Sequence, residues 1–262
     1  MPETPPARPS RDPTGRFGDR AEDYARYRPD YPAALTAYLR ERGWLPERAE
    51  VADVGAGTGI SSALFLDAGC TVYAIEPNAP MRAAAERRLA GRAGFHAIDG
   101  RAEATGLADA SVDLVAAGTA FHWFDAAAAR AEFARILRGR GAVALFWNAR
   151  RRDSAFMHEY AAILTAHCAG YAEADARRRD DDAAVRAFFG AGIADTTTFA
   201  NAQRFDFDGL LGRVRSSSYA PKPGEPAYAE LRAALRALFE RAAAAGRVTL
   251  AYDTHLYVGS VR

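Results

Sequence analysis

The sequence predicts an α/β fold, with a mostly parallel β-sheet that carries helices on both faces. Short apolar segments alternate with helical segments throughout residues 50–148. A glycine-rich turn, GAGTG at 55–59, follows the first apolar segment. Alternation of this kind is typical of parallel sheets, because each parallel strand needs a crossover helix to return the chain.

Each element follows from the local pattern of apolar and turn residues. The expected strands of the first half lie at 49–54, 70–76, 94–99, 111–118 and 141–148. The helices between them are expected at 58–68, 80–91 and 126–138. Two glycines, Gly139 and Gly141, end the last of these helices before the fifth strand begins.

The remaining segments flank this alternating core. Residues 1–16 are rich in Pro, Arg and Thr and predict a disordered leader. Residues 17–45 predict a cap of two short helices, which Pro29 and Pro32 separate. Residues 151–194 predict a helical insertion covering an edge of the sheet. The C-terminal part, 195–262, is expected to hold strands at 196–207 and 247–259 and helices at 208–215 and 226–245.

Composition excludes several classes of protein. The chain of 262 residues is 49% apolar and 26% charged, as expected for a globular enzyme of one domain, here 17–262. A net charge of +1 gives no broad field that would attract nucleic acid or an anionic membrane. No apolar run is long enough to span a bilayer. Two cysteines, Cys70 and Cys168, fit a reducing, cytoplasmic setting.

The spacing of the glycines argues against two common nucleotide sites. Gly55, Gly57 and Gly59 form G-x-G-x-G, and the next residue is Ile60. A dinucleotide fingerprint needs a small residue at that sixth position, where helix and strand pack closely. A P-loop would require a following Gly-Lys-Ser/Thr, which is absent from the sequence.

Two carboxylates indicate the chemistry of the ligand. Asp53 lies two residues before the first glycine, where it would repel a diphosphate and attract an ammonium group. Glu76 ends the second strand, 21 residues after Gly55, and an acid there can accept hydrogen bonds from ribose hydroxyls. A nucleoside with an attached cation and no phosphate fits both, and S-adenosylmethionine has that chemistry. The alternative is that 55–59 is only a tight strand-to-helix turn.

Three segments resemble a known family, the class I S-adenosylmethionine-dependent methyltransferases. They read VADVGAGTGISSALFLDAGCTVYAIEP, AIDGRAEATGLADASVDLVAAGTAFHWFD and RAEDYARYRPDYP. Within this family, the segments are most similar to the type 11 and trans-aconitate methyltransferase-like enzymes of small-molecule and secondary metabolism. The resemblance is strong over 17–150, weaker over 195–262 and loose over 151–194. It implies a Rossmann-like sheet of seven strands, mostly parallel, with the last strand antiparallel.

The resemblance also implies roles for individual residues in the core, 50–150, and in the cap. Gly55, Ala56 and Gly57 would approach the methionine and ribose parts of the cofactor, Asp53 would orient its amino group, and Glu76 would hold the ribose. The other implied cofactor contacts are Asp99 or Gly100 with Ala102 and Glu103 at the adenine, Thr119 near the sulfonium, and Tyr24, Tyr27 and Arg28 in the cap. For the cap residues, a packed aromatic helix with a solvated arginine remains the alternative.

The acceptor is expected beyond the carboxyl ends of strands four and five, where open parallel sheets bind ligands. Candidates there are Phe121, His122 and Trp123 after strand four, and Trp147, Asn148 and Arg150 after strand five. His122 is the best candidate for a general base, because the ordinary pKa of histidine lies near neutrality. The alternatives are that His122 and Trp123 only pack beside the cofactor, and that Arg150 starts a solvated basic turn.

The expected reaction is methyl transfer from S-adenosylmethionine to an oxygen or carbon of a small molecule, partly apolar or carboxylate-bearing. S-adenosylhomocysteine is the expected product, and we expect no metal, no nucleic acid and no membrane partner. Two other functions stay open. One is a nicotinamide-dependent oxidoreductase on a related fold, and the other is a non-catalytic cofactor-binding protein.

Overall fold

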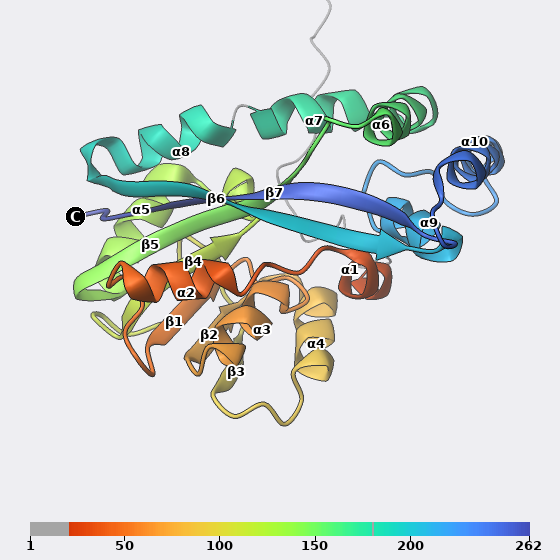
Figure 1. Ribbon diagram of the computed structural model, residues 1–262. Coiled ribbons are helices and arrows are strands. Elements are labelled where there is room, and N and C mark those ends of the chain that lie inside the picture. The colour runs from red at the N-terminus through yellow and green to blue at the C-terminus, as the bar shows by residue number, and fades with distance from the viewer. Residues whose placement is uncertain (1–20, 180) are drawn as a thin grey trace, which may run out of the picture.

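A computed structural model describes residues 21–179 and 181–262 and contains one seven-stranded sheet (Figure 1). The order of the strands is β3-β2-β1-β4-β5-β7-β6. The strands are β1 (Glu50–Val54), β2 (Thr71–Ile75), β3 (Phe95–Ile98), β4 (Val112–Gly118), β5 (Leu137–Arg150), β6 (Ile193–Phe205) and β7 (Val248–Gly259). The predicted leader, 1–16, lies outside the described residues, as do residues 17–20 of the predicted cap.

The directions of the strands confirm the predicted α/β class. β1 pairs in parallel with both β2 and β4, β2 with β3, and β4 with β5. β7 runs antiparallel to both of its neighbours, β5 and β6. The last strand therefore enters the sheet between β5 and β6, and β6 occupies the edge.

Helices lie on both sides of this sheet, as the alternating sequence predicts. The chain forms α1 (Ala21–Tyr27), α2 (Ala34–Glu41), α3 (Ile60–Asp67), α4 (Ala79–Arg88), η3 (Phe121–Trp123), α5 (Ala126–Ile136), α6 (Ala155–His167), α7 (Tyr171–Arg179), α8 (Asp181–Phe189), η4 (Gly190–Gly192), α9 (Phe207–Arg215) and α10 (Pro226–Ala242). Several begin at polar side chains that accept backbone N–H groups of the first turn. The N-caps Asn78, Asp125, Ser154 and Asp206 all do this, which satisfies donors that the helix leaves unpaired.

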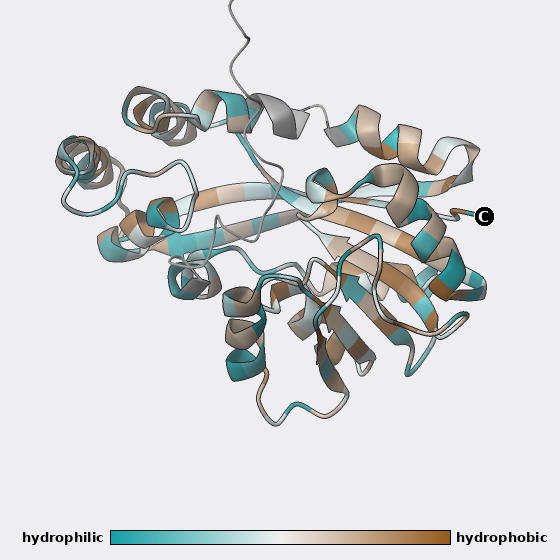
Figure 2. Ribbon diagram, turned by 180° about the vertical axis from the view of Figure 1, so that it is seen from behind, coloured by the Kyte–Doolittle hydropathy of each residue, from teal (hydrophilic) through white to brown (hydrophobic). Residues whose placement is uncertain are grey.

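Two apolar cores form because successive strand residues point to opposite faces of the sheet. On one face, Val143 and Leu145 of β5 pack with α5 and α8. On the other face, Ala144 and Phe146 pack with α2 and α3. A third core joins α6, α9 and α10 to the first half of β7. Figure 2 shows apolar colour concentrated along the central strands.

The insertion after β5 differs from its expected position. Instead of covering an edge, α8 lies on the same face as α5, with Val185, Phe188 and Phe189 buried against Phe133. The edge strand β6 has an exposed residue at every second position. The observed position buries the apolar side of α8 against the face of the sheet, whereas at the edge that side would stay in contact with water.

The N-terminal cap is attached to the C-terminal part of the chain. The ring of Tyr27 in α1 lies against Gly212 of α9, where there is no room for a Cβ atom. The Arg28 guanidinium donates to the backbone carbonyl of Ser216 at 3.0 Å. The Arg28–Ser216 contact joins residues 188 positions apart in sequence, and together the two contacts place the cap beside the carboxyl ends of the strands.

We expect Gly212→Ala to destabilise the protein by about 1–3 kcal/mol, the usual effect of inserting a methyl group into a filled contact. The clash with Tyr27 must outweigh the gain in helix propensity, which is about 1 kcal/mol. Urea unfolding measures the change, and faster amide exchange in α1 would locate it. Gly139→Ala is the matched control, because a Cβ atom there meets nothing within 4 Å. Equal stability of the two variants would contradict the proposed contact.

Candidate active site

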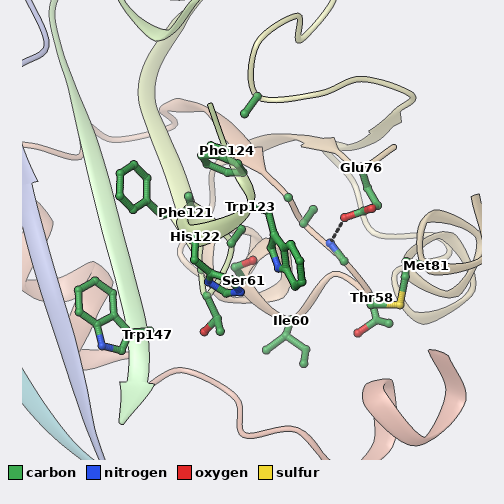
Figure 3. Close-up of a pocket in the computed structure, with 18 of the residues that line it drawn as sticks. Thr58, Ile60, Ser61, Glu76, Met81, Phe121, His122, Trp123, Phe124 and Trp147 are labelled. Atoms are coloured by element: carbon green, nitrogen blue, oxygen red, sulfur yellow. Dashed lines mark hydrogen bonds between the residues drawn. The ribbon is translucent and has the colours of Figure 1, made fainter. Parts of the chain in front are cut away.

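A cavity of about 740 Å³ opens at the carboxyl ends of β1, β2, β4 and β5 (Figure 3). This volume lies within the range of about 300–1,000 Å³ typical of small-molecule and cofactor sites. The cavity receives residues from the turn after β1, the end of β2, the segments after β3 and β4, the end of β5, the cap and α9. It therefore occupies the position where open α/β sheets bind ligands.

The glycine turn, residues 55–59, forms one wall of the cavity. Gly55, Gly57 and Gly59 all have positive φ, at 69°, 57° and 79°. A Cβ atom on Gly55 would lie 2.5 Å from the Cβ of Ala120, so the turn and the segment after β4 touch only because a side chain is missing. The backbone of the turn is thereby exposed to the cavity, which Gly55, Ala56 and Gly57 all line.

Glu76 joins the turn to the end of β2. One carboxylate oxygen accepts the Gly57 N–H at 2.9 Å, and the other accepts the Asn78 N–H at 2.8 Å. The side chain is 8% exposed, and its burial raises the carboxyl pKa above the ordinary value despite these two hydrogen bonds. Each oxygen keeps a further lone pair, so the carboxylate can accept additional hydrogen bonds from a ligand in the cavity.

Asp53 lies beneath the cavity rather than on its wall. It is fully buried, and Ser61 and Ser62 donate to its Oδ2 at 2.8 and 2.6 Å. Its Oδ1 has no hydrogen-bond partner among the described residues. Burial raises the carboxyl pKa to about 6, although the two serine hydroxyls counteract this. Asp53 thus provides a negative charge, or a protonatable group, below the start of α3.

The residues predicted to border an adenine are divided between the cavity and the surface. Gly100, Ala102 and Glu103 line the cavity, and Glu103 also accepts the Asp125 N–H at 2.8 Å. Asp99 differs from the prediction, because its side chain is 70% exposed and forms an ion pair with Arg82. β3 is an edge strand and ends one residue before Asp99, so this side chain reaches solvent and Arg82 instead of the cavity.

The cap covers the cavity with only some of its predicted residues. Tyr24 and Arg28 line it, and the Arg28 guanidinium lies 4.6 Å from the centre of the Tyr24 ring. Tyr27 instead packs on Gly212, outside the cavity. The sequence could not show which of these residues face the cavity and which face α9, because that depends on where α9 packs against α1.

Tyr31 is a cavity residue that sequence reasoning missed. Its hydroxyl is 2.8 Å from the Thr119 hydroxyl, and its ring packs edge-on against Phe146. Burial raises the Tyr31 pKa far above the ordinary value, so the phenol stays neutral at physiological pH. Thr119 has a φ of 57°, a left-handed conformation that is strained for a β-branched residue. Strain of this kind gathers at functional sites, and here it turns the chain into the cavity.

Aromatic side chains form the opposite part of the cavity. Phe121, His122 and Trp123 come from η3, directly after β4, and Trp147 comes from β5. Figure 3 shows Glu76 and Met81 on one side of the pocket and Phe121 and Trp147 on the other. The His122 and Trp123 rings lie 4.8 Å apart, and His122 is exposed. All four predicted aromatic residues therefore meet in one place, although their roles stay predictions.

The basic run after β5 is split between the interior and the surface. Arg150 lines the cavity, whereas Arg151 and Arg152 are exposed and form ion pairs with Asp153 and Asp175. Asn148 also lines the cavity, but its amide oxygen already accepts the Thr254 hydroxyl at 2.6 Å and the Asn201 amide at 3.0 Å. Asn148 therefore also links β5 to β6 and β7.

Arg213 of α9 is the second cavity residue that sequence reasoning missed. It is 3% exposed and lines the cavity. The only signal in the sequence was its position within an amphipathic helix that ends in serines. Because Arg213 comes 63 residues after the end of β5, only the tertiary structure brings it to the cavity.

This fold and cavity define a class of protein: an α/β protein with a cavity at its glycine turn, beyond the carboxyl ends of the parallel strands. Comparison with known sequences gives the family. Residues 52–145 match the methyltransferase domain family. Over 159 residues the chain is 36% identical to an uncharacterized methyltransferase of Mycobacterium tuberculosis, covering 59% of this chain and 60% of that protein. Over 149 residues it is 32% identical to one of Geobacillus kaustophilus, covering 53% and 68%.

The chain belongs to the class I S-adenosylmethionine-dependent methyltransferase family. The fold agrees, since a solved protein from Anaeromyxobacter dehalogenans, provisionally assigned as a type II methyltransferase, superposes with a TM-score of 0.64. That protein is 24% identical, and the match covers 90% of this chain and 98% of the other. The matched region spans about three fifths of the mycobacterial relative.

Asp53 gives a testable dependence of stability on pH. Its carboxyl has a pKa of about 6 in the folded chain and an ordinary value of 3.8, so between these values the folded state holds a proton that the unfolded state has lost. The free energy of unfolding must therefore fall as the pH rises through this window, by about 3 kcal/mol at about 1.4 kcal/mol per unit. Above pH 6 the whole penalty is present.

We expect Asp53→Asn to remove this decrease. Urea unfolding of the ligand-free protein at several values between pH 4 and 7.5 measures it as the difference in slope between wild type and variant. Asp67→Asn is the control, because Asp67 is largely exposed and pairs with Arg92 on the surface. Identical slopes for wild type and Asp53→Asn would show that Asp53 titrates normally in the folded protein.

Proposed function

We propose that this protein transfers the methyl group of S-adenosylmethionine to a small-molecule acceptor, methylating an oxygen or carbon of a partly apolar or carboxylate-bearing metabolite. The observation that carries the proposal is the continuity of the cavity. The glycine turn and Glu76 lie at one end, and Phe121 and Trp147 lie at the other. One space thus holds a nucleoside-binding end and an aromatic end of different chemistry.

The residues present fit the cofactor. S-adenosylmethionine supplies a methyl group on a positively charged sulfur, together with an ammonium, a carboxylate and two ribose hydroxyls. Glu76 would accept the ribose hydroxyls with its remaining lone pairs, and Asp53, whose Oδ1 has no partner among the described residues, would favour the ammonium. Arg28 would take the carboxylate, because a planar guanidinium matches it well. Gly100, Ala102 and Glu103 would flank the adenine, with Thr119 near the sulfur.

The acceptor end needs to position its ligand more than to activate it. Holding two reactants in the reactive orientation lowers a barrier by about 7–11 kcal/mol. Phe121, Trp123 and Trp147 would provide flat surfaces for an apolar acceptor, and Asn148 would border it. His122 would act as a general base or position the acceptor, and its exposure leaves a route for a proton to solvent.

Two other functions are less well supported. A nicotinamide dinucleotide would need a small residue where Ile60 begins α3, and Ile60 itself lines the cavity. A non-catalytic binding protein would not need space beyond the cofactor, and the aromatic end offers such space. We keep a metal-free reaction, a cytoplasmic location and the absence of nucleic-acid or membrane partners as proposals. None of the helices in residues 21–179 and 181–262 has the length and apolar character of a bilayer-spanning segment.

Cofactor binding is tested at Glu76. We expect Glu76→Gln to weaken binding of S-adenosylmethionine and S-adenosylhomocysteine by about 1–3 kcal/mol, or about 5- to 150-fold, because an amide nitrogen cannot accept hydrogen bonds. Isothermal titration calorimetry measures the two affinities. Glu86→Gln, an exposed change on α4, should bind like the wild type. Equal affinities for all three proteins would remove Glu76 from the cofactor site.

Catalysis is tested by transfer of a labelled methyl group. Purified protein, S-adenosylmethionine labelled at the methyl carbon and a small-molecule extract should give a labelled product that mass spectrometry identifies. The product should be absent with Glu76→Gln at low cofactor concentration and return as the concentration rises. Binding of the cofactor without any labelled product from a broad set of extracts would favour the non-catalytic alternative.

A further inference from the structure

We infer that the acceptor binds through a carboxylate, at an anion subsite formed by Arg150 and Arg213. This inference rests on the proposed function, because it concerns the acceptor end of the same cavity. It adds the chemical class that the acceptor must carry and the two residues that select it.

Arg150 is a buried cation with unused donors. Its Nε and Nη1 have no contact with solvent and no hydrogen-bond partner among the described residues. Its Nη2 donates to the Tyr219 hydroxyl at 2.9 Å, a neutral partner. The guanidinium also lies 5.5 Å from the centre of the Tyr160 ring and 5.9 Å from that of Tyr171. Ring faces stabilise a cation, but they do not satisfy its N–H groups.

Arg213 is held in a similar way. It is 3% exposed, and its Nε donates to the Tyr252 hydroxyl at 3.3 Å. Its Nη1 reaches the hydroxyls of Ser216 and Ser217 at 3.4 Å. All three bonds are long and go to neutral oxygens. Within residues 21–179 and 181–262, neither Arg150 nor Arg213 forms an ion pair with a carboxylate.

The two arginines converge on one region. Arg150 is the register partner of Tyr252 across β5 and β7, and Arg213 donates to that same tyrosine. Both arginines line the cavity. Tyr160, whose ring lies beside the Arg150 guanidinium, adds a third group, because its buried hydroxyl has no hydrogen-bond partner among the described residues. Unused donors from Arg150 and Tyr160 and weakly bound donors from Arg213 thus lie together, and an oxygen-rich anion would satisfy them.

Electrostatics favours an anionic ligand strongly. A buried charge is destabilising unless it is paired, and two buried guanidinium groups close together add repulsion. The surrounding tyrosine and serine hydroxyls offset only part of this. A carboxylate placed between the arginines would supply the missing counter-charge through short, charge-assisted hydrogen bonds. Arginine is also the cation that recognises carboxylates with directional specificity, whereas lysine acts as a point charge.

The position suits an acceptor. Arg150 and Trp147 line the same cavity, so an anion at Arg150 would leave the rest of the molecule in the space that the aromatic residues border. The carboxylate of the cofactor is the other possible source of this anion, because Arg28 also approaches Ser216. An experiment must therefore separate acceptor binding from cofactor binding.

The test uses full-length wild type, Arg150→Gln and Arg213→Gln, each titrated calorimetrically with S-adenosylhomocysteine and then, at saturation, with defined probes. The probes are benzoate and octanoate, their neutral amides benzamide and octanamide, and inorganic phosphate. We expect the wild type to bind the carboxylates at least about tenfold more tightly than the amides. Each variant should lose this preference, yet bind S-adenosylhomocysteine within about threefold of the wild type.

Arg151→Gln is the matched control, because Arg151 is the adjacent residue in sequence but lies on the surface paired with Asp153. It should behave as the wild type with every probe. Tyr160→Phe covers the case in which an arginine variant fails to fold. It removes only an unpaired buried hydroxyl, so it should unfold at the same temperature or higher while the affinity for carboxylates falls about threefold or more.

Three outcomes would overturn the inference. Equal binding of carboxylates and amides by the wild type would show that there is no anion subsite. A loss of S-adenosylhomocysteine affinity as large as the loss for carboxylates would assign the arginines to the cofactor. Binding of phosphate but not of carboxylates would change the acceptor class. If S-adenosylhomocysteine fails to bind the wild type, the proposed function fails, and the probes titrated alone still decide the anion subsite.

Discussion

The carboxylate of Glu76 fixes the part of the molecule on which the whole site depends. Its two oxygens hold the N–H groups of Gly57 and Asn78, so the glycine turn, the end of β2 and the start of α4 are joined at one point. The turn can lie there only because Gly55 has no side chain to collide with Ala120. A backbone arranged in this way borders the cavity without filling it, since Gly55 and Gly57 contribute no side chains to the space.

The charged residues of this cavity differ in sign from one part of the site to another. Asp53 and Glu76, both acidic, lie at or beneath the glycine turn, whereas the basic Arg150 and Arg213 line the cavity from β5 and α9. Asp53 and Arg150 have buried polar atoms with no hydrogen-bond partner among the described residues, and the bonds that Arg213 donates to hydroxyls are long, which lowers the stability of the ligand-free protein. Natural proteins accept such local destabilisation where a ligand will restore the missing partners. A cation-bearing donor and an anion-bearing acceptor would therefore bind in one orientation, with the methyl group between them.

The cap and the C-terminal part close the site together. Arg28 binds the carbonyl of Ser216, and the ring of Tyr27 lies on Gly212, so the first helix and α9 act as one cover. Tyr31 then extends from this cover to Thr119, whose strained backbone turns the end of β4 inward. Residues from the two ends of the chain thus complete a cavity whose floor comes from the centre.

The sequence by itself determined the parallel sheet, the glycine turn and the two carboxylates at its end. These are local features, because strands, turns and helix starts are encoded by residues a few positions apart. It also placed the aromatic tract after β4, since every parallel strand ends at the same side. Only the tertiary structure decided which residues of a local run face the cavity. Arg150 points inward while Arg151 and Arg152 pair at the surface, and Asp99 points outward. Tyr31 and Arg213 reach the site, and α8 lies on a face of the sheet, through contacts between segments distant in sequence, which no local pattern encodes.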